Sequence, residues 1–458
     1  MSGEYVFSLE PVEVPKISTQ HRKIRTAIPH EGTREIIERL AKVESRSMHG
    51  QIPLVWDSAR DYVVCDSAGN QWIDFTSTIF VANVGHSNSR VVSRMKEELD
   101  KPIVGCYAYP NETRMKYLEA LLKFAGPPFE KGFLLSAGTE STEAALKLIR
   151  LYGKKVGKKK GIVISFTGNW HGRTLGAQQL SSNEKQKEWI YSPDPDILFL
   201  PFPYPWEVNE KNGFDFFMNS IEILVTRGLN IETDVCGFIL ETFQGWGALF
   251  YPSSFVKAVR QKSSEISALL CFDEMQSGFA RTGKRFGFEH YEVAPDLICC
   301  GKGMGGGVPL SGVLGRAEIM DLPEVGNMSS THSGNPLMCA AGLAVLEEIE
   351  SRDLVNESHR KGLMLEENLN KLVDQYPLLL RGSYGKGLIR SVIFNSTEFR
   401  TASHNASLFS ELCFRAGLLV VHTGRESVKL GPPLTIPESA ISEALTVMEG
   451  ALRVLCQK

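Results

Sequence analysis

Three apolar runs that end in polar residues constrain the fold of this chain more than any other feature. The runs at residues 235–240 and 268–272 lead directly into Glu241 and Asp273, and a third, at 297–300, leads through a glycine into Lys302. They follow one another at about thirty residues, the length of a strand–helix–strand unit. Runs that are apolar throughout are typical of parallel sheets, where both faces of a strand are buried. The pattern therefore predicts buried parallel strands.

The polar residues at the ends of these strands are candidates for a shared site. Open α/β sheets bind their ligands at the carboxyl ends of the strands, so Glu241, Asp273 and Lys302 are expected to share one crevice. A lysine at the end of a buried strand must meet an anion, lose its charge or be used covalently, although a lone Gly-Lys pair can equally belong to a surface loop. An acid for a cofactor nitrogen, together with a lysine for a Schiff base, is the pattern expected for pyridoxal phosphate (PLP).

A phosphate site is predicted farther toward the N-terminus. Residues 132–136 have the pattern of a strand, and residues 137–148 continue with helical spacing. Small residues at such a turn expose backbone N–H groups at the positive end of the helix dipole. Gly138 and Thr139 are therefore candidates to hold a phosphate, and an ordinary helix N-cap is the alternative.

Composition limits the classes of function that fit. The chain has 458 residues, 43% of them hydrophobic, and a formal net charge of −3. This length predicts one large and one smaller domain. No basic patch suggests nucleic acid, and no apolar stretch is long enough to cross a membrane. The nine cysteines are scattered without metal-site spacing, and the N-terminus is polar, so we expect a cytoplasmic protein without a metal.

The order of elements predicts an α/β fold. Strands are expected near residues 132–136, 161–166, 196–200, 235–241, 268–273, 296–300 and 311–315, with helices between them. They form a mostly parallel seven-stranded sheet. A helix near 32–43, a hairpin over 62–75, helical residues 336–375 and a strand at 417–421 complete the prediction. We expect an N-terminal arm with part of a small domain at 1–75, a large cofactor-binding domain at 76–335, and a C-terminal small domain at 336–458.

Two other patterns do not fit known sites. The glycines at 301, 303 and 306 match the dinucleotide-binding fingerprint, but Val308 and Pro309 follow where a helix should continue. His171, His290 and His332 lack metal-ligand spacing, and we assign them no role.

Taken together, the motifs resemble the class III, PLP-dependent aminotransferases of fold type I. The resemblance extends from about residue 50 to about residue 455. The matching stretches lie, in order, at residues 74–77, 83–86, 136–140, 170–176, 241 with 244–245, 273–279, 301–303 and 331–337. Their order and spacing make the resemblance specific, and it implies a large PLP-binding domain with a smaller α+β domain built from both termini.

The resemblance implies a role for most of these residues. By it, Lys302 forms the Schiff base, Asp273 pairs with the pyridine nitrogen, and Gln276 lies near the ring oxygen. Trp170 is similar to the aromatic residue that stacks on the ring, and Gly138 and Thr139 hold the phosphate. Thr331 would reach the phosphate of a neighbouring subunit, which implies a homodimer with shared active sites.

The substrate side shows both matches and departures. Arg173 stands where relatives bind a substrate carboxylate. We expect Glu241 and Lys429 to contact the substrate as well. Lys429 replaces an arginine found in members that use 2-oxoglutarate, and lysine cannot grip a carboxylate with two parallel bonds. Trp246 replaces a second acid, and Thr78 replaces a glycine. 2-Oxoglutarate is therefore expected to be a poor acceptor.

The resemblance implies a transfer of an amino group from an amine or amino acid to a keto acid. An amino-acid racemase or epimerase of the same family is the main alternative, since the glycine-rich stretch 303–311 and Lys429 are similar to such members, whereas Arg173 favours a transaminase. A decarboxylating transaminase is a third possibility. A binding protein without catalysis is disfavoured, because Lys302, Asp273 and Gln276 are all present.

Overall fold

The computed structural model describes residues 5–457, which form two compact units. The smaller unit contains the residues up to Asn88, the short segment Trp246–Ala248 and the residues from Glu357 on, so it is built from both ends of the chain. The larger unit contains Ser89–Gly245 and Leu249–Asn356. The domain bounds expected from the sequence, 1–75, 76–335 and 336–458, stay predictions.

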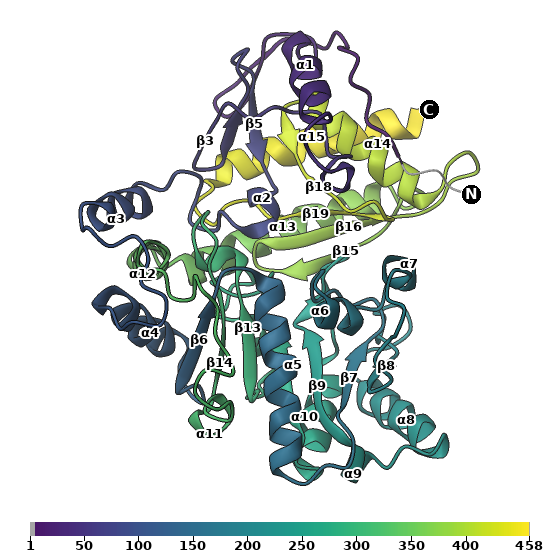
Figure 1. Ribbon diagram of the computed structural model, residues 1–458. Coiled ribbons are helices and arrows are strands. Elements are labelled where there is room, and N and C mark those ends of the chain that lie inside the picture. The colour runs from purple at the N-terminus through teal and green to yellow at the C-terminus, as the bar shows by residue number, and fades with distance from the viewer. Residues whose placement is uncertain (1–4, 458) are drawn as a thin grey trace. The chain divides into compact units, whose positions relative to one another are not determined.

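A seven-stranded sheet forms the centre of the larger unit (Figure 1). Its strands lie in the order β6 (Lys131–Leu135), β14 (Ser311–Gly315), β13 (Leu297–Cys300), β12 (Leu269–Asp273), β9 (Val235–Glu241), β7 (Ile162–Phe166) and β8 (Ile197–Leu200). Among the described strands of this sheet, β14 alone runs in the direction opposite to the other six. The predicted mostly parallel sheet of seven strands is confirmed.

The register of the central strands brings their polar ends together. β12 lies between β9 and β13, and Asp273 pairs in register with Glu241 on one side and with Cys299 on the other. Lys302 follows three residues beyond Cys299. All three polar ends therefore lie at one edge of the sheet, as predicted from the spacing of the apolar runs.

Helices cover both faces of this sheet, which explains why its strands are apolar throughout. On one face, α5 (Gly138–Lys155) packs with Ile239, Cys271 and Cys299 in one buried cluster. Alternate strand residues point the opposite way. There, Phe238 contacts Phe217 of α8 (Gly213–Thr226), with ring centroids 6.0 Å apart, and α8 packs on α10 (Ser253–Glu265).

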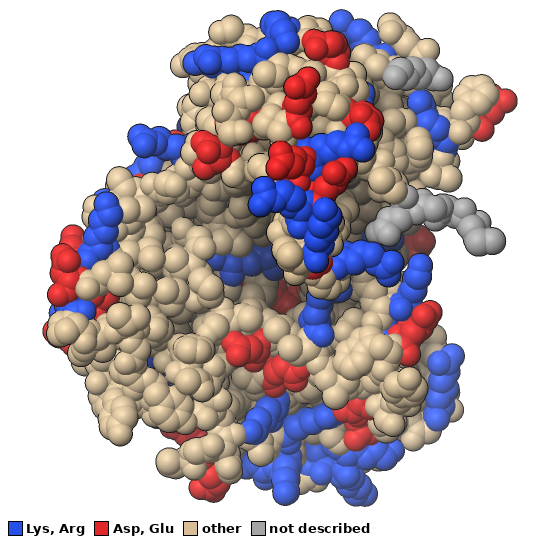
Figure 2. Space-filling model, turned by 45° about the horizontal axis from the view of Figure 1, so that its top comes forward, with Lys and Arg blue, Asp and Glu red and all other residues tan. Residues whose placement is uncertain are grey.

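The other elements of the larger unit are shorter or peripheral. They are α3 (Ser89–Leu99), α4 (Glu112–Ala125), α6 (Leu175–Leu180), α7 (Glu184–Lys187), α9 (Ile231–Asp234), α11 (Ala317–Met320), α12 (Pro336–Ser351), β10 (Phe243–Gln244) and β11 (Leu249–Phe250). None of the helices of residues 5–457 combines the length and the apolar character that spanning a membrane requires. Charged side chains of both signs lie on the face of the molecule that Figure 2 shows.

The smaller unit contains two sheets. The first has the order β1 (Ile17–Ser18), β2 (Lys23–Ile24), β5 (Gln71–Asp74), β4 (Val63–Cys65) and β3 (Ser58–Arg60), with β17 (Leu418–Leu419) beside β5. The second has the order β15 (Leu380–Lys386), β16 (Ile389–Phe394), β19 (Ser427–Leu430) and β18 (Val421–His422). Its helices are α1 (Glu31–Leu40), most of α13 (Leu354–Gln375), α14 (Ala402–Arg415) and α15 (Glu438–Gln457).

The predicted hairpin over 62–75 and the predicted helix near 32–43 are confirmed by β4, β5 and α1. The single strand predicted at 417–421 is wrong. Its first part is β17, which pairs with β5, and its end begins β18, which pairs with β19 of the other sheet. The apolar run does not indicate that its two halves pair with strands of different sheets, because that pairing is set by contacts with distant parts of the chain.

A left-handed turn follows β5. Ser77, Thr78, Ile79 and Phe80, labelled α2 (Ser77–Phe80), have φ angles of 47°, 50°, 59° and 69°. The buried carboxylate of Asp74 holds the turn, since it accepts hydrogen bonds from the Ser77 N–H at 3.0 Å and from His86 Nε2 at 2.7 Å. Phe80 is buried, whereas Thr78 is exposed. Such a conformation costs about 1–2 kcal/mol per residue with a side chain.

Candidate active site

A pocket of about 160 Å³ lies at the carboxyl ends of the central strands of the larger unit. It brings together seven of the residues singled out from the sequence: Gly138, Thr139, Trp170, Glu241, Asp273, Gln276 and Lys302. His171, Gly172 and Met275 complete its lining. The shared crevice predicted for the three strand ends is therefore present.

Lys302 reaches the pocket from a single turn of 3-10 helix, Lys302–Met304, directly after β13. Its amino group makes no hydrogen bond or ion pair with any residue of the described part of the chain. Burial lowers the pKa of Lys302 below its usual value, and the nearby carboxylates of Asp273 and Glu241 raise the pKa by less. The lowered pKa makes the neutral, nucleophilic amine easier to form than it is for an exposed lysine.

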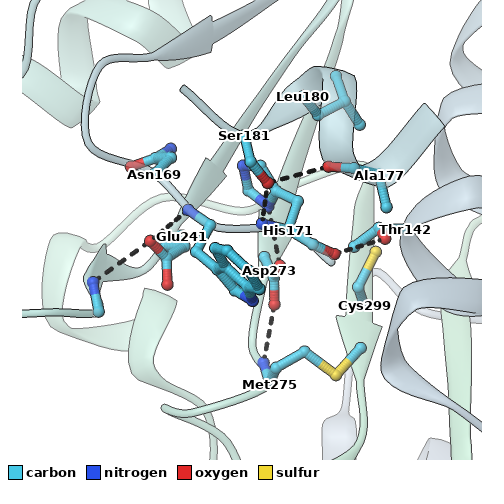
Figure 3. A network of polar contacts seen from close by, with 12 residues as sticks. Thr142, Asn169, His171, Ala177, Leu180, Ser181, Glu241, Asp273, Met275 and Cys299 are labelled. Carbon is cyan, nitrogen blue, oxygen red and sulfur yellow. Dashed lines mark hydrogen bonds and ion pairs between the residues drawn. The ribbon is translucent and has the colours of Figure 1, made fainter. Parts of the chain in front are cut away.

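Asp273 is held by two donors inside the pocket wall (Figure 3). One carboxylate oxygen accepts the Met275 N–H at 3.0 Å, and the other lies 2.8 Å from His171 Nδ1. The two contacts fix the orientation of the carboxylate. A carboxylate held in this way can still accept a hydrogen bond from a protonated ring nitrogen.

His171 is the main residue that reasoning from the sequence missed. Its backbone is fixed on both sides, because its N–H donates to Ser181 Oγ at 2.8 Å and its carbonyl accepts from Thr142 Oγ1 at 2.8 Å (Figure 3). Its Nε2 atom is buried and has no partner among residues 5–457. Nothing in the spacing of the histidines indicates this contact, since His171 and Asp273 meet only through the pairing of distant strands.

Glu241 is buried and accepts hydrogen bonds from three parts of the chain. Its Oε2 atom accepts the N–H groups of Trp170 at 3.0 Å and Gly245 at 3.2 Å, and its Oε1 atom lies 3.4 Å from Gln276 Nε2. Burial raises the pKa of Glu241 to about 7, and the charge of Asp273 adds to the rise, while His171 and the two N–H groups oppose it.

The opposite end of the pocket is formed by the start of α5. The N–H groups of Ser136 and Ala137 donate to the Glu140 side chain, at 2.9 and 2.8 Å. Those of Gly138 and Thr139 have no hydrogen-bond partner in the described part of the chain. Two unpaired N–H groups at the positive end of an 18-residue helix are well suited to a phosphate.

Met275 packs between two glycines of the site. A Cβ atom built on Gly138 would lie 2.7 Å from Met275 Sδ, and one built on Gly301 would lie 2.5 Å from the same atom. Both positions therefore exclude a side chain while Met275 keeps its place. The sequence motif contains Met275 but does not indicate this packing.

Three predicted residues do not line the pocket. Arg173 is exposed, with its guanidinium carbon 4.6 Å from the centre of the Trp170 ring. Thr331 is exposed in the turn before α12. Lys429 is buried in β19 of the smaller unit, with its Nζ atom 4.9 Å from the centre of the Phe80 ring.

The pocket fits PLP in its chemistry. A buried amine shares the pocket with a carboxylate held by two hydrogen-bond contacts, an indole lines the wall, and the start of α5 offers two N–H groups without a partner among the described residues. Lys302 would bond to the cofactor, Asp273 would face its ring nitrogen, and Gly138 and Thr139 would hold its phosphate. No group of three or more His, Cys, Asp or Glu side chains within residues 5–457 is arranged to bind a metal ion.

Comparison with known proteins identifies the family. The family model "Aminotransferase class-III" matches residues 45–452. A probable 4-aminobutyrate aminotransferase of Bacillus subtilis is 33% identical over 402 residues, which cover 85% of this chain and 90% of that protein. A leucine/methionine racemase of Thermococcus litoralis is 31% identical over 431 residues, covering 91% of this chain and 95% of the racemase.

A solved structure agrees with both the fold and the cofactor. The PLP-bound amine transaminase of an uncultivated Pseudomonas species is 25% identical, with a TM-score of 0.81, over 90% of this chain and 97% of that one. The resemblance seen in the motifs is thereby confirmed. The chain belongs to the class III aminotransferases, which are PLP-dependent enzymes of fold type I.

Proposed function

We propose that the pocket around Lys302 transfers an amino group from an amine or an amino acid to a keto acid. The observation that carries the proposal is a lysine amine without a hydrogen bond or ion pair to the described residues, inside the same pocket as Asp273 and the two N–H groups of Gly138 and Thr139, which have no partner among those residues. When bound, PLP supplies an electron sink for charge that develops on the substrate carbon.

Lys302 has two tasks in this proposal. Its neutral amine is the group that bonds covalently to the cofactor, and burial favours that neutral form. With PLP and substrate bound, Lys302 Nζ would be placed to take a proton from the substrate carbon as a base and to return it as an acid. Its place beside two carboxylates keeps the returning proton near the reacting atoms.

The other pocket residues hold the cofactor in place. Asp273, fixed by His171 and Met275, balances the charge of a protonated ring nitrogen. The Trp170 ring provides a stacking surface, and Gln276 offers an amide to the ring oxygen. Hydrogen bonds to charged groups of this kind contribute roughly 1.5–3 kcal/mol each.

We propose that Arg173 and Lys429 recognise carboxylates of the substrates. Stacking on Trp170 leaves the fork of the Arg173 guanidinium exposed, and such a fork can form two parallel bonds with a carboxylate. Lys429 can attract a carboxylate only as a point charge. This difference supports a poor fit for 2-oxoglutarate, which has two carboxylates to satisfy.

A homodimer is proposed as the active form. Six apolar side chains between the end of α3 and the start of α4 each have close to half or more of their surface exposed: Leu99, Ile103, Val104, Tyr107, Tyr109 and Met115. The Tyr107 hydroxyl lies 3.5 Å from Ser329 Oγ, two residues before Thr331. Thr331 therefore lies beside a surface of the kind that protein interfaces cover.

The cytoplasm is the proposed compartment. All nine cysteines of the chain are free, and six of them are buried. Buried free thiols are typical of proteins from reducing compartments, where disulfides are rare.

A racemase is the second candidate, because a relative named as a leucine/methionine racemase aligns over most of the chain. Both activities need a lysine that moves protons, and they differ in what is released. A transaminase forms a keto compound from the donor and a new amine from the acceptor, whereas a racemase only inverts the configuration of one amino acid.

The experiment is a screen of amines and amino acids against pyruvate and 2-oxoglutarate with the purified protein and PLP. The expected result is a keto product and a new amino product in equal amounts, with pyruvate preferred. Change of chirality without any exchange of amino groups would assign the racemase activity instead. Absence of PLP binding, measured by absorbance before and after borohydride reduction, would overturn both candidates.

A further inference from the structure

The carboxylate of Glu241 is occupied by hydrogen bonds from other parts of the chain. It lies at the end of β9, 5% exposed, and its two oxygens accept from donors on three separate segments of the chain. These donors are the Trp170 N–H after β7, the Gly245 N–H after β9 and the Gln276 amide after β12 (Figure 3 shows the two contacts of Oε2).

The three donors belong to the walls of the pocket. Trp170 and Gln276 both line it, and Gly245 packs closely against the same group. A Cβ atom on Gly245 would lie 2.5 Å from Gln276 Nε2 and 2.6 Å from Glu241 Oε1. Glu241 thus connects the stacking wall of the pocket to the amide expected at the ring oxygen.

We propose that Glu241 is a positioning residue: its ionised carboxylate holds Trp170, Gly245 and Gln276 in the arrangement that receives PLP, and the affinity for PLP falls when Glu241 gains a proton. This role replaces the direct substrate contact expected for Glu241, and it depends on the proposed function only in that the pocket binds PLP.

The chemistry of the carboxyl group explains the dependence on protonation. An ionised carboxylate accepts hydrogen bonds at both oxygens, whereas a carboxylic acid turns one of them into a donor. With donors facing both oxygens, a proton on Glu241 must displace at least one of them. Burial places the pKa of Glu241 at about 7, so this change falls near neutral pH.

Other titratable groups face Glu241 and act on the same equilibrium. They are Asp273 on β12, His171 on the loop after β7, Lys302 after β13 and Tyr251 after β11. Lys302 must also be deprotonated to bond to PLP, and the phosphate of PLP titrates in the same range. Loss of affinity at low pH alone is therefore not specific for Glu241, and a comparison between variants is required.

The test measures the Kd for PLP by absorbance in the wild type and in Glu241→Gln, which mimics the protonated carboxyl. At about pH 8.5 the variant should bind PLP at least tenfold more weakly than the wild type. At about pH 5.5, where Glu241 of the free wild type is itself protonated, the two Kd values should agree within about threefold. The phosphate contributes equally to both proteins and cancels in the ratio of Kd values. Loss of the Glu241 charge removes one contribution that raises the pKa of Lys302, which favours the neutral amine in the variant and therefore opposes the expected weakening.

Two further variants complete the design. Glu292→Gln removes an exposed carboxylate, the one that pairs with Lys257. The ratio of its Kd for PLP to that of the wild type should stay near one at every pH. Glu241→Asp keeps the charge but withdraws it from the three donors, so it should weaken PLP binding at about pH 8.5, and it decides the matter if the Gln variant does not fold.

Three outcomes would overturn the proposal. They are a ratio for Glu241→Gln that does not change with pH, unchanged PLP binding in either Glu241 variant, and a raised KM for substrate with an unaltered Kd for PLP. The last would return Glu241 to a direct substrate contact. A wild-type protein that binds no PLP at any pH would instead refute the proposed function.

Discussion

Removing the His171 side chain is expected to reduce activity through Asp273. The Nδ1 atom of His171 lies 2.8 Å from Asp273, and both side chains are buried. In His171→Ala, the carboxylate keeps only the Met275 N–H as a donor. Loss of a hydrogen bond to a charged group costs roughly 1.5–3 kcal/mol, and each 1.4 kcal/mol is about tenfold in rate. We therefore expect kcat/KM to fall by about ten- to a hundredfold.

His171→Asn is the matched control. The amide nitrogen of asparagine can take the place of Nδ1, and the atom that it does not replace, Nε2, has no partner among residues 5–457. The backbone of residue 171 is held by Ser181 and Thr142 independently of its side chain. The Asn variant should therefore keep kcat/KM within about threefold to fivefold of the wild type, since it retains the hydrogen bond.

Steady-state kinetics with a saturating supply of PLP, together with thermal unfolding of each variant, checks this expectation. If His171→Ala is as active as His171→Asn, the hydrogen bond to Asp273 has no part in catalysis. Equal, large losses in both variants would mean that the imidazole ring itself acts, and the reasoning from the Nδ1 contact would be refuted.

Other changes test the remaining assignments. Lys302→Ala should abolish turnover and leave PLP removable by gel filtration, and an adduct that survives borohydride treatment in this variant would exclude Lys302. Thr331→Ala should lower the affinity for PLP without dissociating the dimer, and a fully active monomer in sedimentation would contradict the shared site. Arg173→Ala should lower kcat/KM for carboxylated substrates by about ten- to a hundredfold more than for simple amines. Lys429→Arg should improve the use of 2-oxoglutarate, and efficient turnover of that acceptor by the wild type would count against the argument. Thr78→Gly should raise the free energy of unfolding by about 1 kcal/mol, because glycine adopts the left-handed conformation without strain, and a lowered melting temperature would refute this.

The central sheet could be predicted because its residues carry the information locally. Strands buried on both faces are apolar along their whole length, and the polar residues that end them stand out in the sequence. Lys302, Asp273 and Glu241 were found in this way, and the structure places them in one pocket. The start of α5 was also recognisable, since a strand, small residues and a helical pattern follow one another.

Contacts made only by tertiary packing could not be predicted. His171 meets Asp273 across 102 positions of sequence, and no periodicity links the two. The left-handed turn is a stronger case, because Ser77, Thr78 and Ile79 have side chains that disfavour it. The turn is held because Ser77 donates its N–H to the nearby Asp74 carboxylate and its hydroxyl to the carbonyl of Gly431, which is 354 positions away in the sequence.

The packing of Met275 between Gly138 and Gly301 has a consequence for how the family can vary. A side chain added at either glycine would meet the sulfur of Met275, so the thioether would have to move first. Room for a side chain at either glycine therefore depends on the residue at position 275. We expect a smaller residue at position 275 to open space at both glycines at once, although they lie on separate segments of the chain.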